Sequence, residues 1–136
     1  MKKKNTNAII IEVSIGELID RITILEIKAI KFTSKDKIEN AQIELKLLLT
    51  KFKQEVQQDE DILKLMCELK EINLKLWDLE NHIRVLEEQH KFDSNFIETA
   101  RCIYKTNDRR TEIKKMICRK TNSRIVDEKE YFRFPE

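Results

Sequence analysis

The chain has 136 residues and a formal net charge of +2, and 38% of its residues are charged while 40% are hydrophobic. It contains one glycine and one proline, whereas sandwiches and doubly wound folds need many of both in their tight turns. The composition therefore predicts an all-α protein, an antiparallel helical bundle with coiled-coil-like packing in a single domain of ordinary size.

No apolar run approaches the roughly 20 residues that a membrane-spanning helix needs. The apolar run at residues 8–11 follows a basic start but is shorter than the about 7–15 residues of a secretory signal. The three cysteines lack the spacing of metal ligands, and the two histidines have no third ligand near them. We therefore expect a cytoplasmic protein with reduced thiols, without a membrane span, a metal or a cofactor.

The expected domain spans residues 1–136, divided into an arm or short strand at 1–13, a three-helix core at 14–91, a C-terminal helix or pair of kinked helices at 93–121, and an extended tail at 122–136. Residues 8–13 are the expected strand, because this segment is short and rich in β-branched residues. Ser14 and Glu17 have the spacing of a capping box, which predicts the start of a first helix that ends near residue 32.

One acidic residue interrupts the apolar stripe of this first helix. Glu26 falls inside the apolar arc of the helical wheel, where a carboxylate is costly unless it is paired or hydrogen-bonded. We interpret it as a half-buried ion pair with a Lys or Arg of the third or fourth helix. The alternatives are an acid of a functional site, or an exposed residue on a helix whose buried face is shifted.

The third helix, about residues 61–90, has the clearest pattern in the chain, and it follows a second helix that ends near residue 56. Its apolar residues alternate strictly at three and four positions: Ile62, Leu65, Leu69, Ile72, Leu76, Leu79, Ile83 and Leu86. Such a 3.5-residue repeat is typical of a helix packed along a partner helix. Short connections make neighbouring helices antiparallel. We expect helices one to three to form the core, and a homodimer through the second or third helix.

The fourth helix begins after a cap at Asp93 or Ser94 and ends near Thr121. A second possible cap at Thr106 or Asn107 leaves two alternatives, one continuous helix or a helix that kinks or restarts there. We expect the helix to dock across the first three. Residues 124–126 are again β-like and an aromatic tail follows at 131–134. We expect the two ends of the chain to be unpaired, and their pairing as a small ribbon is the alternative.

Charge is distributed unevenly along the chain. Residues 53–98 hold six Lys and Arg against twelve Asp and Glu, whereas residues 99–125 hold nine against two. A basic C-terminal third favours either packing against the acidic middle or an anion-binding surface. The candidate ligand-binding residues are Asp20, Arg21, Glu26, Trp77, Glu80, Arg84, Arg101, Tyr104, Asn107, Asp108, Arg109, Arg110 and Lys114.

These candidates fit more than one kind of arrangement. Free backbone amides at a cap near Asn107 would join Arg109, Arg110 and Lys114 in a pocket for phosphate, sulfate or a sugar nucleotide. The alternatives are a solvated basic face, Trp77 as the anchor of an interface, and a buried polar network that fixes the register of the helices. If the first, third and fourth helices pack together, the candidates can converge at one end of the bundle.

Several strings resemble a family of small bacterial proteins of unknown function: EVSIGELIDRITILEIK at residues 12–28, LWDLE at 76–80, ARCIYKTNDRR at 100–110 and VDEKEY at 126–131. The resemblance spans most of the chain. It implies a short helical protein, sometimes found beside glycosyltransferase genes, and it brings no activity and no catalytic residue.

From these observations we expect a non-catalytic interaction or scaffold protein with a possible protein partner, linked through the resemblance to surface-polysaccharide assembly. The alternative is a binding protein or enzyme for an anionic small molecule, with Glu26 or Asp108 as the acid or base. A nucleic-acid-binding accessory protein ranks third, because the acidic middle and a pI near 8.4 disfavour it. The sequence has no glycine-rich phosphate loop and no HExxH motif.

Overall fold

The computed structural model describes residues 7–132, in which the regular structure consists of four helices. These are α1 (Ile15–Lys31), α2 (Lys35–Glu55), α3 (Glu60–Glu88) and α4 (Ser94–Lys120). The all-α prediction is confirmed, and each helix ends within two residues of the predicted position. None of the helices in this part of the chain combines the length and apolar character that crossing a membrane requires.

The helices α1, α3 and α4 each begin at a residue whose side chain caps them, whereas Ser34 before α2 makes no such hydrogen bond. The Ser14 hydroxyl accepts a hydrogen bond from the Glu17 amide at 2.9 Å, and Asp59 and Asp93 cap α3 and α4 in the same way. Such caps satisfy amides that have no partner inside the helix. The other half of the predicted capping box is absent, because the Glu17 carboxylate binds Lys114 instead of returning to Ser14.

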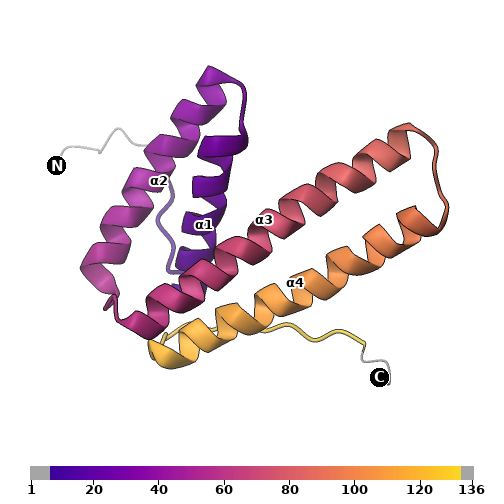
Figure 1. Cartoon of the computed structure of the whole chain (residues 1–136). Coiled ribbons are helices and arrows are strands. Elements are labelled where there is room, and N and C mark those ends of the chain that lie inside the picture. Colours follow the sequence, from indigo (N-terminus) through magenta and orange to yellow (C-terminus); the bar gives the residue numbers. More distant parts are fainter. Residues whose placement is uncertain (1–6, 133–136) are drawn as a thin grey trace.

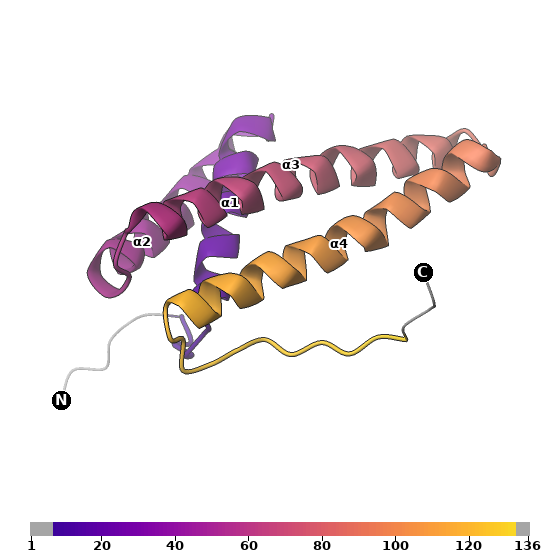
Figure 2. The same ribbon diagram turned by 60° about the horizontal axis from the view of Figure 1, so that its bottom comes forward.

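The four helices form two hairpins, α1–α2 and α3–α4, which cross each other (Figure 1). The α1 helix contacts each of the other three, whereas the backbone of α2 comes close to α1 alone among the helices. The α4 helix runs antiparallel along α3, and the far end of this hairpin extends beyond α1 and α2 (Figure 2). The prediction that the fourth helix docks across a core of the first three is therefore wrong. The main partner of α4 is α3, whose 3-4 spaced apolar residues from Ile62 to Leu86 form what we call the α3 seam.

The hydrophobic core lies at the crossing of the two hairpins. Its buried members come from all four helices and the segment after α2: Ile19, Ile22, Phe52, Val56, Ile62, Leu65, Leu69, Ile113 and Ile117. Farther along the hairpin, Leu79 and Ile83 are only half-buried, whereas Leu86 near the end of α3 is buried again. The core thus holds α1 against the end of the hairpin where α3 begins and α4 ends, and this contact positions the site described below.

The α4 helix is continuous through Thr106 and Asn107, so of the two alternatives the structure has the single helix, without a second cap or a kink. Backbone amides in a helix interior are bonded to carbonyls four residues earlier, and none is free at these positions to hold an anion. Thr106 is buried. Packing of α4 along α3 outweighs the weak local preference of Thr, Asn and Asp for a cap.

The two ends of the chain meet without forming a strand anywhere in residues 7–132, so within that part of the chain the expected unpaired arrangement holds and the alternative ribbon is not formed. The Arg124 guanidinium pairs with the Glu12 carboxylate, and the Ser123 hydroxyl accepts a hydrogen bond from the Ile15 amide at 3.0 Å. These side-chain contacts leave no continuous backbone ladder. Residues 1–6 of the predicted arm and 133–134 of the predicted aromatic tail lie outside the described residues.

Candidate functional site

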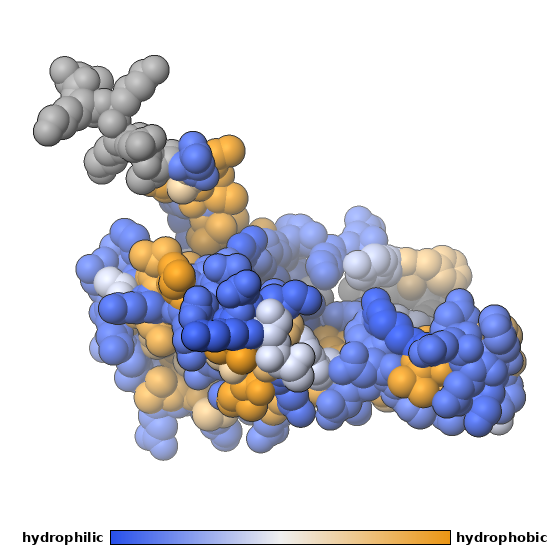
Figure 3. Space-filling view, turned by 90° about the horizontal axis from the view of Figure 1, so that it is seen from above, coloured by the Kyte–Doolittle hydropathy of each residue, from blue (hydrophilic) through white to orange (hydrophobic). Residues whose placement is uncertain are grey.

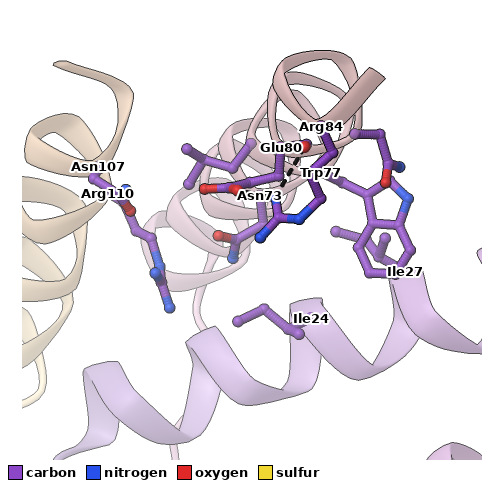
Figure 4. Close-up of a pocket in the computed structure, with 10 residues that line it drawn as sticks. Ile24, Ile27, Asn73, Trp77, Glu80, Arg84, Asn107 and Arg110 are labelled. Atoms are coloured by element: carbon purple, nitrogen blue, oxygen red, sulfur yellow. Dashed lines mark hydrogen bonds and ion pairs between the residues drawn. The ribbon is translucent and has the colours of Figure 1, made fainter. Parts of the chain in front are cut away.

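A groove of about 470 Å³ lies where α1 crosses the α3–α4 hairpin (Figure 4). Its lining comes from three helices: Ile24 and Ile27 of α1; Asn73, Leu76, Trp77, Glu80, Asn81 and Arg84 of α3; and Asn107 and Arg110 of α4. A mostly apolar cleft of about 300–1,000 Å³ with a few convergent polar groups is the usual form of a small-molecule site. The groove has this form.

Beside this groove, a buried ion pair joins α1 to α4. The Asp20 side chain is 1% exposed, and it accepts hydrogen bonds from Nε of Arg110 at 3.0 Å and from Nη2 at 2.5 Å. The hydrogen bond to Asp20 raises the pKa of Arg110, with burial acting in the opposite sense and the charges of Asp20 and Glu17 adding to the rise. The paired geometry is the strong, two-point form of a charge-assisted hydrogen bond.

The same carboxylate is tied to α3 through an amide. Nδ2 of Asn73 donates to Oδ1 of Asp20 and to the Thr23 hydroxyl, both at 2.9 Å, and that hydroxyl donates to the Asp20 carbonyl at 2.8 Å. In the described structure, every buried side-chain nitrogen or oxygen has a hydrogen-bond partner. A fully satisfied polar network of this kind fixes the positions of three helices relative to one another.

A second group of charges continues from this network to the C-terminal tail. The ammonium group of Lys114, whose side chain is 12% exposed, lies 2.7 Å from Glu17, 3.3 Å from Asp127 and 3.9 Å from Asp20. Burial is the largest influence on the pKa of Lys114 and lowers it, but the hydrogen bond to Glu17 and the surrounding acids together raise it. Lys114 therefore serves as a structural cation between α1, α4 and the tail.

The open side of the groove carries the groups that remain available to a ligand. Arg84, 70% exposed, pairs with Glu80 one helical turn before it. The side-chain amides of Asn81 and Asn107 make no hydrogen bond with residues 7–132. The indole of Trp77 contacts the Phe32 ring at 5.9 Å between centroids, so one part of it is anchored while another lines the groove.

The structure gathers about half of the predicted site residues and disperses the rest. Trp77, Glu80, Arg84, Asn107 and Arg110 line the groove, and Asp20 lies behind Arg110. The others lie outside the groove. Four of them form ion pairs: Arg21 with Glu17, Arg101 with Glu98, Arg109 with Glu112 and Glu68, and Glu26 with Lys70. Tyr104 and Asp108 line another hollow beside the tail, and Lys114 belongs to the charge network described above.

Glu26 has the partner expected of a structural ion pair. Its carboxylate lies 3.6 Å from Nζ of Lys70 on α3, and both side chains are about one-third exposed. The anion pocket that a cap near Asn107 would have formed with Arg109, Arg110 and Lys114 is not assembled, because α4 offers no free amide there. Arg109 and Lys114 are held by acids of the chain, whereas Arg110 lines the groove.

Sequence reasoning missed Asn73 and Asn81, as well as the apolar wall formed by Ile24 and Ile27. Asn73 directly follows Ile72, so it lies beside the 3-4 series of apolar residues and is not a member of it. A search for polar residues within that series therefore does not find Asn73. No signal in one sequence marks Asn81, whose role depends on how α1 crosses α3.

Comparison with known proteins adds a family and no activity. No curated protein and no solved structure matches the chain. Among the described residues, no three His, Cys, Asp or Glu side chains are grouped so that they could hold a metal ion. A family model, described as a family of unknown function (DUF6165), matches residues 9–134 and thus nearly the whole length. The chain therefore belongs to this family of unknown function.

Proposed function

We propose that the protein is a non-catalytic binding protein and that the groove at the hairpin crossing holds its ligand. The observation that carries this proposal is the chemistry of the groove lining. Its polar groups are amides, guanidinium groups and an indole, and the single acid–base side chain among the described lining residues, Glu80, is paired with Arg84. Such groups recognise a ligand but do not transfer protons or attack it.

The residues that an enzyme would need lie elsewhere. No Ser, Thr, Cys, Lys, His or Tyr is among the described side chains lining the groove, so Glu80, which is paired with Arg84, is the one lining side chain that could act as a nucleophile. The two acids considered as catalysts are also outside it, Glu26 in its pair with Lys70 and Asp108 in the hollow beside the tail. These positions support binding over catalysis.

A second observation favours an interaction with another protein. In the arm before α1, Ile9 and Ile10 are 91% and 96% exposed, and Figure 3 shows the described part of this arm as an apolar projection from the helical body. An extended β-branched segment can add a strand to an open sheet edge. We therefore retain an interaction or scaffold role, with a partner offering such an edge. The link to surface-polysaccharide assembly stays a prediction from the resemblance.

Binding to nucleic acid remains the third candidate. Several basic residues of α4 face acids of the same chain: Arg101 with Glu98, Arg109 with Glu112, Lys115 with Glu128, and Lys120 with Asp61. Proteins gain affinity for nucleic acids when their Lys and Arg side chains neutralise phosphates and release the bound counterions. A cation that already pairs with an acid of its own chain contributes less to this release. This pairing supports ranking the nucleic-acid role below the other two.

The chain's single tryptophan gives a direct test of the groove. We would screen small polar, anionic, cationic and neutral compounds by thermal shift and by Trp77 emission. We expect at least one class to raise the melting temperature and change the emission, because a bound ligand stabilises the native state. Asn81→Tyr should block both effects, whereas Gln42→Tyr on α2 should leave them intact.

Two outcomes would count against the proposal. If no compound class changes either signal, or if Asn81→Tyr leaves binding unchanged, the groove is not the site. If a bound compound is recovered chemically altered after incubation, the protein is an enzyme and not a binding protein.

A further inference from the structure

Arg110 uses only part of its hydrogen-bonding capacity inside the protein. Its Nε and Nη2 donate to the buried Asp20 carboxylate, while Nη1 makes no hydrogen bond within residues 7–132. A guanidinium group is planar and carries five N–H donors in a fixed fork. Engaging the Nε edge therefore leaves the donors of the Nη1–Nη2 edge unused.

That unused edge has access to the groove. Arg110 reaches from α4 toward α1 (Figure 4), its side chain is 27% exposed, and it is part of the groove lining. Asp20, by contrast, is fully buried behind it. The edge that Asp20 does not cover is thus the one available to a molecule in the groove.

The network behind Arg110 also holds the guanidinium in place. Asn73 fixes Asp20, and Asp20 fixes two nitrogens of Arg110. A side chain that is already ordered loses little conformational entropy when a ligand binds. Arg110 is therefore a preorganised donor for two parallel hydrogen bonds, the geometry that matches a carboxylate or a phosphate.

The charges around the groove limit how many anionic groups a ligand can carry. Asp20 balances the charge of Arg110, and Glu80 balances that of Arg84. Attraction to an anion then depends on directed hydrogen bonds more than on excess positive charge. A second anionic group would lie near Glu80, whose charge repels it. This balance favours one oxyanion over a diphosphate chain.

We propose that the groove binds a small molecule with one carboxylate or phosphate group on an apolar or aromatic body. The oxyanion accepts two hydrogen bonds from the Nη1–Nη2 edge of Arg110, and the body lies on the apolar wall of the groove. That wall is formed by Ile24, Ile27, Leu76 and Trp77. This inference rests on the proposed binding function and adds the chemical class of the ligand.

Calorimetric titration with four probes tests the inference: 2-naphthoate, 2-naphthyl phosphate, the neutral 2-naphthamide and inorganic phosphate. We expect one or both naphthyl anions to bind at least about tenfold more tightly than the amide, because a charge-assisted bidentate contact outweighs a neutral one. The better of the two anions identifies the head group. Inorganic phosphate should bind much more weakly, since it lacks the body.

A matched pair of variants on α4 identifies the responsible arginine. Arg110→Lys keeps a cation beside Asp20 but removes the planar fork, so we expect anion binding to weaken about tenfold and amide binding to stay the same. Arg101→Lys, on the outer face of the same helix, should change neither. If Arg110→Lys does not fold, the preference of the wild-type protein for the anions over the amide still decides the question.

The possible failures are distinguishable. If the amide binds as tightly as the anions, or if Arg110→Lys binds anions normally, the inference is overturned while the groove remains a binding site. If none of the four probes binds, the stated ligand class is wrong, and the wider compound screen with Asn81→Tyr judges the binding function separately.

Discussion

Asp20 and Arg110 lie 90 positions apart in the chain and form a two-point ion pair in which the carboxylate is fully buried and the guanidinium lines a groove. The pair joins α1 to α4, and Asn73 extends it to α3. One set of contacts thus fixes how the two hairpins cross and orients the arginine that we assign to ligand binding. Stability and binding are therefore expected to be coupled at this pair.

Removing the charge of Asp20 should destabilise the fold strongly. Asp20→Asn leaves Arg110 without its anion, and breaking one partner of a buried pair costs about 3 kcal/mol or more of unfolding free energy. Glu26→Gln is the matched control on the same helix, with an expected cost of about 0–1 kcal/mol because its pair with Lys70 is partly exposed. Urea unfolding measures both, and equal losses would show that the Asp20 network is not central.

The chain's single glycine permits the close approach of α1 to α4. A Cβ atom at Gly16 would lie 2.6 Å from the backbone oxygen of Lys114 and 3.0 Å from Sγ of Cys118. We expect Gly16→Ala to lower the unfolding free energy by about 1–3 kcal/mol, although alanine is the better helix former by about 1 kcal/mol. Asn40→Ala, on an exposed turn of α2, should not destabilise. An unchanged melting temperature for Gly16→Ala would contradict the packing described.

Lys114 should stabilise the protein in a pH-dependent way. Its pKa is raised above the ordinary value of 10.5 in the folded state, despite opposing burial, by Glu17 and the neighbouring acids. A cation with a raised folded pKa contributes its full stability below the unfolded value and loses it as pH rises through the folded value. The difference in unfolding free energy between wild type and Lys114→Met should therefore be constant from pH 7 to 9 and shrink above about 10.5. Urea unfolding across this range checks it, and a difference that grows with pH would refute the assignment.

The homodimer expected from the sequence remains a prediction, and α2 offers a surface for it. Ile43 and Leu47 are exposed one helical turn apart on this helix, whose backbone contacts α1 alone among the helices. We expect wild-type protein to sediment as a dimer and Leu47→Glu to sediment as a monomer, because a buried charge opposes an apolar interface. Leu63→Glu, at an exposed position of α3, is the control for the alternative interface. A monomeric wild type would contradict the dimer.

Helix positions were predictable because they depend on local signals. The caps at Ser14 and Asp93 and the 3-4 spacing of α3 are formed by residues close together in the sequence, and the structure follows them. The arrangement of α4 was not predictable in the same way. The 3-4 spacing of apolar residues predicts that a helix packs along a partner helix, but it does not identify which helix that partner is.

The buried acid was misplaced for a related reason. The apolar stripe of α1 marks one buried face, but α1 contacts three helices and has a second buried face that includes Gly16, Asp20 and Thr23. Because the periodicity of apolar residues marks only the first face, it predicts that polar residues on the second face are exposed to solvent. Periodicity therefore singles out Glu26, which is half-buried, and gives no sign that Asp20 is the more deeply buried acid of α1.

The most direct test of the central claim is an NMR titration of the ¹⁵N-labelled protein with 2-naphthoate. If the groove at the hairpin crossing is the binding site, shift changes will cluster at its lining, including Ile24, Asn81 and Asn107. Clustering on the outer basic face of α4 around Arg101 and Arg109, or on the N-terminal arm, would contradict the account.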